Sequence, residues 1–296
     1  MNALPFHGIE ASELLLTNKG AVYHLNLVPA QLADIIITVG DPARVAAVSK
    51  YFDKIECIVS HREFVTHTGY IGAKRISVIS TGIGTDNMDI VLNEIDALAN
   101  IDFTTRKVKP QTKQLKIIRM GTCGALHKNI QPGALVLSAY AIGLDNLMHY
   151  YKLPNNTDEQ YILHEFSLHT RLVNSIITPY IAEASIQLRK YFGKDFHHGI
   201  TITSPGFFAP QGRALRAQPA FPHLVDALTT FNSRDMQVLN FEMETSGLYG
   251  LGKVLGHHCV SISTVTNNRI TTQAIHDMDV AVDDMIRKTL AIIAGM

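Results

Sequence analysis

Cysteine is scarce in this chain of 296 residues: Cys57, Cys123 and Cys259 lie far apart, and no two have C-x-x-C spacing. An odd number of isolated cysteines argues against a disulfide framework, and the spacing argues against a structural zinc site. We therefore expect a protein of a reducing compartment, the cytoplasm.

The sequence also lacks long hydrophobic runs and an excess of either charge. Its longest apolar runs, such as Ile35–Val39, are too short to span a bilayer, and the first residues lack a basic, apolar secretory signal. Because 26 basic side chains balance 26 acidic ones, no overall field favours nucleic acid or an anionic membrane. We expect neither as a partner, and a small molecule is the better candidate ligand.

Metal and nucleophile motifs are missing as well. The 14 histidines show no H-E-x-x-H or comparable spacing, so no metal site is expected. No serine lies in a nucleophile elbow, and Cys123 has no recognisable base partner.

Short apolar segments alternate with amphipathic helical patterns along the chain, which predicts one α/β domain over residues 1–296, with a central mixed β-sheet flanked by helices. Strands are expected at 34–39, 55–60, 64–70, 75–80, 115–120, 134–142, 200–203, 238–243 and 258–265. Helices are expected from 42, over 88–98, 245–255 and 282–293, and, interrupted at Pro179, over 170–192. The polar segment 102–114 is expected on the surface, without a function.

The central segment is Leu115–Leu126, an apolar run followed by Gly121 and Gly124. We expect a strand buried on both faces that ends in a glycine turn, with Arg119 and Thr122 at its carboxyl end, where open α/β sheets bind ligands. A salt-bridged arginine beside an ordinary turn explains this segment equally well.

Further glycines follow the strands that end at Val39 and Ser80. After Gly40, Asp41 is a good helix N-cap and precedes Pro42 and Arg44. A strand, a glycine and a capped helix present backbone N–H groups to an anion. Together with Arg119 and Thr122, this segment suits an oxyanion such as phosphate, because the arginine fork donates two parallel hydrogen bonds.

Two other clusters suit a nucleoside. Gln211 and Arg213 match the carbonyl and imide groups of a planar ring, on which Phe207 or Phe208 could stack, although a solvated loop is the simpler explanation. Glu242–Glu244 places two carboxylates around Met243 at a strand end, where a carboxylate accepts hydrogen bonds from a vicinal diol. A charged helix N-terminus is the alternative, and both can hold.

In this combination the sequence resembles the nucleoside phosphorylase family, in particular its uridine-cleaving type. The resemblance covers most of the chain and rests on seven short motifs in the family's order: 23–25, 40–44, 60–64, 80–84, 119–122, Gln211-x-Arg213 and 241–244.

The resemblance implies cleavage of a nucleoside by inorganic phosphate to a free base and ribose 1-phosphate, without a redox or metal cofactor. It assigns phosphate to Gly40, Arg44, Arg62, Arg119 and Thr122. It assigns the nucleoside to His24, Thr122, Phe207, Gln211, Arg213, Glu242, Met243 and Glu244. Of these, catalysis falls to Arg119, Gln211, Arg213 and Glu244. His24 and Arg62 would reach a neighbour's pocket, which implies a homo-oligomer, a dimer or a hexamer built of dimers.

Some residues depart from the family pattern. Cys123 and Gly212 replace other residue types, and 102–114 is an insertion. A monovalent cation between subunits, near Glu63 and Ile83, is left open because Asn87 replaces an expected serine. Purine-cleaving relatives carry an aspartate where this chain has 266–269, Thr-Asn-Asn-Arg, which favours a pyrimidine: uridine, deoxyuridine or thymidine. The alternatives are a purine or broad-specificity phosphorylase, a hydrolysing nucleosidase and a non-catalytic nucleoside-binding protein.

Overall fold

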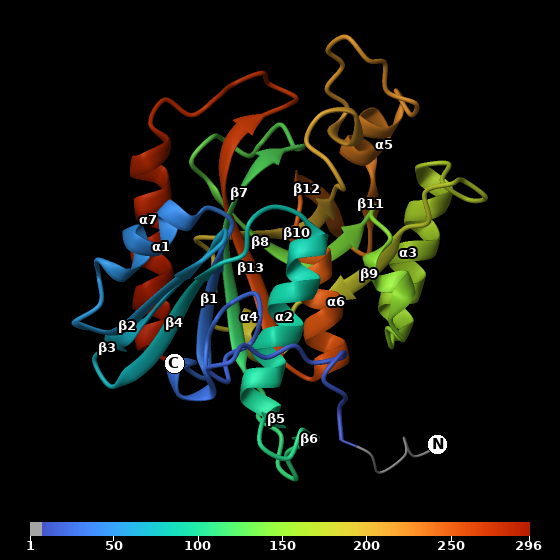
Figure 1. The fold of residues 1–296 in the computed structure, drawn as a ribbon. Coiled ribbons are helices and arrows are strands. Elements are labelled where there is room, and N and C mark those ends of the chain that lie inside the picture. The colour runs from blue at the N-terminus through green and yellow to red at the C-terminus, as the bar shows by residue number, and fades with distance from the viewer. Residues whose placement is uncertain (1–7) are drawn as a thin grey trace.

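The computed structural model describes residues 8–296, in which eleven strands form one mixed sheet (Figure 1). Its strands are β1 (Ile35–Val39), β2 (Lys54–His61), β3 (Phe64–Ile71), β4 (Lys74–Ser80), β7 (Lys116–Ala125), β8 (Leu135–Gly143), β9 (Tyr180–Glu183), β10 (His197–Thr203), β11 (Asn232–Ser233), β12 (Met236–Glu242) and β13 (His258–Asn268). A separate hairpin pairs β5 (Ile101–Asp102) with β6 (Lys107–Val108).

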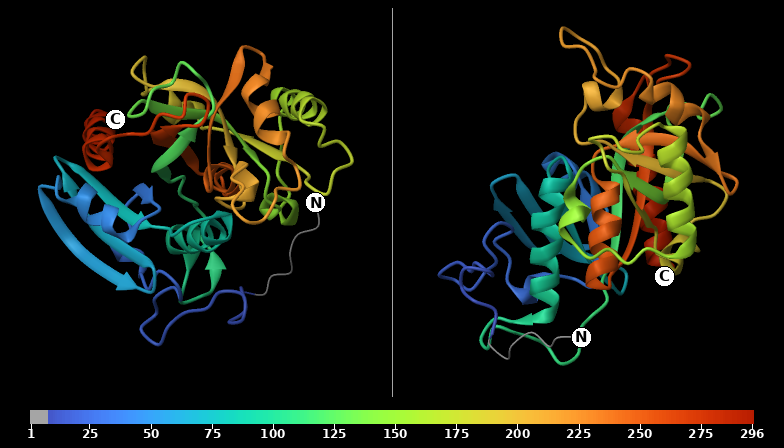
Figure 2. Two further views of the ribbon diagram at one scale, coloured as in Figure 1. Left: turned by 90° about the horizontal axis from the view of Figure 1, so that it is seen from above. Right: turned by 90° about the vertical axis from the view of Figure 1, so that its right-hand side faces the viewer.

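Helices cover both faces of this sheet. They are α1 (Pro42–Ser49), α2 (Thr85–Asn100), α3 (Thr157–His169), α4 (Ile186–Arg189), α5 (Leu224–Thr230), α6 (Thr245–Leu255) and α7 (Met278–Ala294), with 3₁₀ turns η1 (Pro29–Gln31), η2 (Leu147–Tyr150) and η3 (Ala209–Gln211). Alternate strand residues point to opposite faces. Thus Ile36 and Ile117 belong to the core beneath α2 and α6, whereas Ile37 and Ile118 belong to the core beneath α1 and α7. Figure 2 shows the sheet with helices on both of its sides.

The sheet closes on itself at one end. The parallel strands β1, β4 and β7 lie side by side, and β7 continues through β13, β8, β10 and β12. Strand β12 also pairs with the second half of β7, where Phe241 lies opposite Gly124. This pairing brings the carboxyl end of β12 beside the second half of β7.

The prediction of a turn at Gly121–Gly124 is wrong, because strand β7 continues without interruption to Ala125. Neither glycine has a positive φ. Each is required for space instead: a Cβ atom at Gly121 would lie 1.9 Å from Nη1 of Arg119, and one at Gly124 would lie 2.8 Å from the ring of Phe241. The glycines therefore admit large side chains against the strand.

The other expected elements before residue 144 are confirmed, with two refinements. The side chain of Asp41 caps α1 by accepting from the Ala43 amide, and α1 ends at Ser49, before Phe52. The surface segment 102–114 includes part of the β5–β6 hairpin.

The helical prediction for 170–192 is wrong. Strand β9 and the short helix α4 occupy its second half, because β9 pairs with β8 and its residues Tyr180–Ala182 are buried there. The segment 144–166, which the sequence left unassigned, contains η2 and most of α3, and the sequence gave no indication of α5 or β11. The strands β10, β12 and β13 and the helices α6 and α7 lie where they were expected, with bounds that differ by a few residues.

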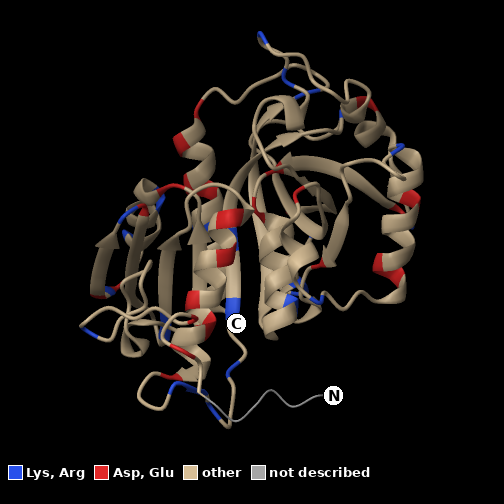
Figure 3. Cartoon of the chain, turned by 45° about the vertical axis from the view of Figure 1, so that its right-hand side comes forward, with Lys and Arg blue, Asp and Glu red and all other residues tan. Residues whose placement is uncertain are grey.

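Acidic and basic residues both occur on many elements of the chain (Figure 3). Helix α2 is an exception, because it contains Asp86, Asp89, Glu94 and Asp96 and no lysine or arginine. Within residues 8–296, we find no helix with the length and hydropathy needed to cross a bilayer.

Candidate active site

One cavity of about 570 Å³ collects most of the residues that the sequence singled out. It opens where β1, β7 and β12 end, next to the loop that contains η3. It is lined by Gly40, Asp41, Pro42, Arg44, Gly82, Ile83, Arg119, Thr122, Cys123, Gly124, Phe207, Gln211, Arg213, Phe241, Glu242, Met243, Glu244, Thr266 and Asn267. Segments separated by more than 200 residues in the sequence, such as those of Gly40 and Asn267, therefore line one pocket.

Two guanidinium groups lie at the end of the cavity that β1 and β7 form. Arg44 extends from α1 and places Nη1 3.4 Å from the carbonyl oxygen of Met120, which precedes Gly121 on β7. Burial, reinforced by the charge of Arg119, lowers the pKa of Arg44. Among residues 8–296, no carboxylate lies within ion-pair distance of Arg44. An anion between the two guanidinium groups would relieve their repulsion.

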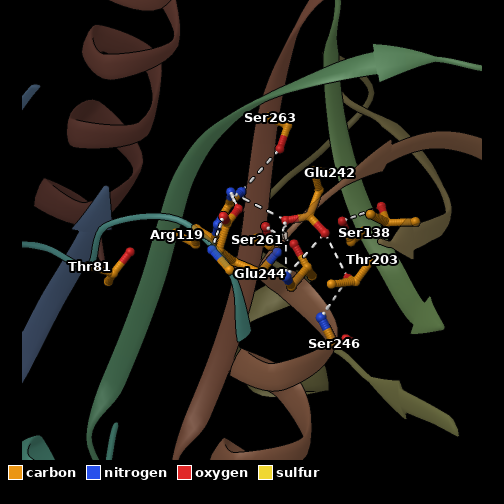
Figure 4. A network of polar contacts seen from close by, with 12 residues as sticks. Thr81, Arg119, Ser138, Thr203, Glu242, Glu244, Ser246, Ser261 and Ser263 are labelled. Carbon is orange, nitrogen blue, oxygen red and sulfur yellow. Dashed lines mark hydrogen bonds and ion pairs between the residues drawn. The ribbon is translucent and has the colours of Figure 1, made fainter. Parts of the chain in front are cut away.

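Arg119 itself is buried, with 4% of its surface exposed. Its side chain folds back over Gly121 of the same strand. Nη2 donates to Oε2 of Glu244 and lies 3.3 Å from Oε2 of Glu242, while Nη1 lies 3.5 Å from the hydroxyl of Ser263 (Figure 4). Burial alone would lower the pKa of Arg119, but the two carboxylates outweigh it and raise that pKa.

Glu244 is the N-cap residue of α6 and is also buried. Its Oε1 accepts from the Gly84 amide at 2.7 Å, so Glu244 ties the start of α6 to the start of α2. Burial raises the pKa of Glu244, although Arg119 acts in the opposite direction. The cavity therefore keeps a carboxylate next to Met243 that is paired with a cation of the same cavity.

Glu242 plays a different part, because protein donors occupy both of its oxygens. Oε1 accepts from the Thr203 hydroxyl at 2.7 Å, and Oε2 accepts from the amides of Glu244 and Thr245 at 2.9 and 3.0 Å. Figure 4 shows Glu242 between Arg119 and Thr203. Glu242 thus fixes the loop that leads into α6, and its contact with a nucleoside stays a prediction.

The end of the cavity near η3 is lined by the residues that the resemblance assigned to the base. Gln211 is buried, and its Oε1 accepts from Arg213, which also donates to the Phe207 carbonyl at 2.6 Å. The guanidinium carbon of Arg213 lies 3.8 Å from the centroid of the Phe207 ring. Burial, with a smaller contribution from Arg269, lowers the pKa of Arg213 to about 10. Because Arg213 satisfies the amide oxygen, the amide nitrogen of Gln211 remains as a donor.

A family model described as "Phosphorylase superfamily" matches residues 34–294. The chain belongs to the phosphorylase superfamily. Uridine phosphorylase of Thermococcus kodakarensis is 31% identical over 87% of this chain and 81% of its own length, and that of Haemophilus influenzae is 30% identical over 84% and 86%. The crystal structure of Trypanosoma brucei nucleoside phosphorylase, described as showing uridine phosphorylase activity, superposes with a TM-score of 0.87 and 30% identity, over 96% of this chain and all of the other.

These superfamily comparisons confirm the family resemblance and the predicted α/β class, with a mixed sheet between helices. A purine relative, DeoD-type purine nucleoside phosphorylase of Myxococcus xanthus, is more distant, at 24% identity over 91% of this chain and 96% of its own length. The domain limits 1–296 stay a prediction, since residues 1–7 lie outside the described residues.

Arg269 was not predicted as a site residue from the sequence, although it contacts Gln211 of the cavity. Its Nη1 donates to the Gln211 carbonyl at 3.2 Å, and its guanidinium carbon, like that of Arg213, lies 5.6 Å from the centroid of the Phe241 ring. Burial lowers the pKa of Arg269. The sequence offered only a basic residue three positions after Thr266, with nothing to place it beside Gln211.

His24 and Arg62 do not line the cavity of their own chain. They lie together elsewhere: Arg62 donates to the Tyr23 hydroxyl at 3.1 Å, and His24 contacts Glu94 of α2. Phe208 is also absent from the cavity wall, so of the two stacking candidates Phe207 is the one that reaches it. In residues 8–296 we find no group of three His, Cys, Asp or Glu side chains arranged to hold a metal ion.

Proposed function

We propose that this protein is a uridine phosphorylase, a pentosyltransferase that converts uridine and phosphate to uracil and ribose 1-phosphate. One observation carries the proposal: the cations Arg44 and Arg119, the carboxylate of Glu244 and the amide of Gln211 line a single cavity. The uridine phosphorylases that are 30 and 31% identical to the chain support the choice of substrate.

The geometry matches the charge that develops during phosphorolysis. A phosphate oxygen bonds to C1′ of the ribose while the C1′–N1 bond breaks, and its electron pair passes to the pyrimidine. The sugar becomes positive and the base negative on the way, so the reaction needs an anion beneath the sugar and donors at the base carbonyls. Arg44, Arg119, Thr122 and the backbone at Gly40 hold the phosphate, and Gln211 and Arg213 stabilise the leaving uracil.

Glu244 and Met243 complete the ribose site. The Glu244 carboxylate accepts hydrogen bonds from the ribose hydroxyls through the lone pairs that Arg119 and the Gly84 amide leave free, and Met243 packs on the sugar. How closely these two residues surround the 2′ position decides between uridine and its deoxy analogues, deoxyuridine and thymidine.

A base-release assay tests the proposed function directly. Uridine, thymidine and inosine are incubated with the enzyme with and without phosphate, and free base is quantified. We expect uracil release from uridine that requires phosphate. Release without phosphate would indicate a nucleosidase, preferential release from inosine would indicate a purine phosphorylase, and calorimetric binding without release would indicate a nucleoside-binding protein.

Arg213→Ala is expected to impair recognition of the base more than binding of phosphate. Loss of a donor to the departing uracil should lower kcat/KM for uridine by about 100-fold, with little change in the KM for phosphate. The matched control is Arg216→Ala, which removes an exposed arginine from the same loop and should leave both constants unchanged. An unaltered preference for uridine over inosine in Arg213→Ala would contradict the base-site assignment.

We further propose a cytoplasmic homo-oligomer, a dimer or a hexamer built of dimers, in which His24 and Arg62 of one subunit complete the pocket of its neighbour. Their position outside their own cavity, on one face of the chain, supports this sharing. Phosphate is the co-substrate, and we propose no cofactor. The monovalent cation between subunits, near Glu63 and Ile83, stays open.

A further inference from the structure

His24 is held in place by one carboxylate from the middle of α2. Glu94 Oε1 accepts from the His24 backbone amide at 2.9 Å and lies 2.7 Å from Nδ1 of the His24 ring. Oε2 accepts from the Leu25 amide at 2.8 Å. A single side chain therefore fixes both the backbone and the ring of His24.

This contact also determines which ring nitrogen carries the proton. An ionised carboxylate only accepts hydrogen bonds, so Nδ1 of His24 must be the donor. In the neutral ring the lone pair is then on Nε2. The side chain of His24 is 28% exposed and that of Glu94 is 12% exposed, so the carboxylate is largely covered while the ring reaches the surface.

We propose that Glu94 is a positioning residue, which holds the His24 ring so that Nε2 accepts a hydrogen bond from the 5′-hydroxyl of a nucleoside bound to the neighbouring subunit. The inference rests on the proposed function, in which His24 of one subunit forms a hydrogen bond with the 5′-hydroxyl of a nucleoside in the pocket of another subunit. It adds the residue that orients His24 and the nitrogen that makes the contact.

Two further contacts hold the same segment independently of Glu94. His61 of β2 places Nδ1 2.9 Å from the His24 carbonyl oxygen. Arg106, at the tip of the β5–β6 hairpin, donates to the backbone carbonyls of Ile9, Glu10 and Leu14 at 2.7, 2.8 and 2.6 Å. Neither contact involves Glu94, so we expect the segment to stay in place when the Glu94 carboxylate is altered. The contacts of Arg106 also give the segment 102–114 a structural role.

The inference is tested with Glu94→Gln and two substrates, uridine and 5′-deoxyuridine, which lacks the hydroxyl that His24 would contact. The variant amide can donate toward Nδ1 and so permits the wrong tautomer. We expect the preference for uridine over 5′-deoxyuridine, as a ratio of kcat/KM values, to fall about tenfold. Turnover of 5′-deoxyuridine should hardly change. Glu94→Asp, which keeps the charge, should retain part of the preference.

The matched control is Asp96→Asn, which alters another carboxylate of α2 that faces a histidine, at 3.2 Å from His257 Nε2. It should leave the preference unchanged. In a His24→Ala background, Glu94→Gln should cause no further loss of preference. Thermal melting identifies variants that do not fold. If Glu94→Gln does not fold, Glu94→Asp and the His24→Ala single variant supply the comparison.

Equal losses on both substrates would overturn the inference, because a purely structural role affects both alike. A wild-type enzyme with no preference for the 5′-hydroxyl would also overturn it, while leaving uridine phosphorolysis intact. Absence of any turnover of uridine would instead refute the proposed function.

Discussion

Replacement of Arg119 by alanine is expected to abolish phosphorolysis, with a loss in kcat/KM for uridine of about 1,000-fold. Arg119 is the buried cation of the cavity and lies beside Glu242 and Glu244. Without it the phosphate loses a bidentate donor, and two buried carboxylates lose their counter-charge. The loss is measured as phosphate-dependent release of uracil at saturating and limiting phosphate.

The same substitution should also cost stability, by about 3–5 kcal/mol, since an uncompensated buried charge remains. Activity is therefore measured well below the midpoint of thermal unfolding, with circular dichroism as the check on folding. Arg119→Lys is the informative companion, because it retains the charge but not the planar fork. Arg287→Ala, which removes an arginine with 58% side-chain exposure from α7, is the control. A variant of Arg119 that keeps most of its activity would contradict the assignment of the phosphate site.

Gly121→Ala is expected to lower kcat/KM by about 100-fold, although it adds a single methyl group, because a displaced catalytic group costs that much. A Cβ atom at Gly121 would lie 1.9 Å from Nη1 and 2.6 Å from Cζ of Arg119. The guanidinium must therefore leave its seat between Glu244 and Ser263. The expected signature is a raised KM for phosphate together with a lowered kcat.

Gly193→Ala is the matched control for this substitution. Gly193 does not have a positive φ, and a Cβ atom there would meet nothing within 4 Å. It should keep full activity. If Gly121→Ala kept full activity, as expected for Gly193→Ala, then Gly121 would not determine the position of the Arg119 guanidinium. The double variant Gly121→Ala/Arg119→Ala should have the same kcat/KM as Arg119→Ala alone, because both substitutions act through Arg119.

Local signals in the sequence were sufficient for much of the fold. The strand 34–39, the Asp41 cap and the apolar spacing of 88–98 depend on neighbours in the chain, and each prediction is confirmed. The helix predicted for 170–192 was wrong because strand β9 pairs with β8, which lies about 40 residues earlier in the sequence. This pairing outweighs the helical spacing of the apolar residues. Pairing between strands that are distant in the sequence cannot be predicted from the residues of one short segment.

The site divides in the same way. Arg44, Arg119, Gln211 and Glu244 were identified from residue type and motif, and one cavity does bring them together. The purpose of Gly121 could not be read from sequence, because a glycine that admits a side chain looks the same as one that makes a turn. Arg269 was missed because its neighbour, the Gln211 carbonyl, is 58 residues distant and carries no side-chain signature. The roles of His24 and Arg62 stay predictions.

The pairing of Arg119 with Glu244 has a consequence for the binding of the two substrates. In the proposed function one of these partners holds the anion and the other holds the sugar, so the two substrates bind to a single charge-paired unit. Phosphate bound to Arg119 would offset part of its positive charge and so change the field at Glu244. We therefore expect each substrate to change the affinity for the other, and by linkage the coupling is equal in both directions. The KM for uridine, measured at a series of phosphate concentrations, reports this coupling.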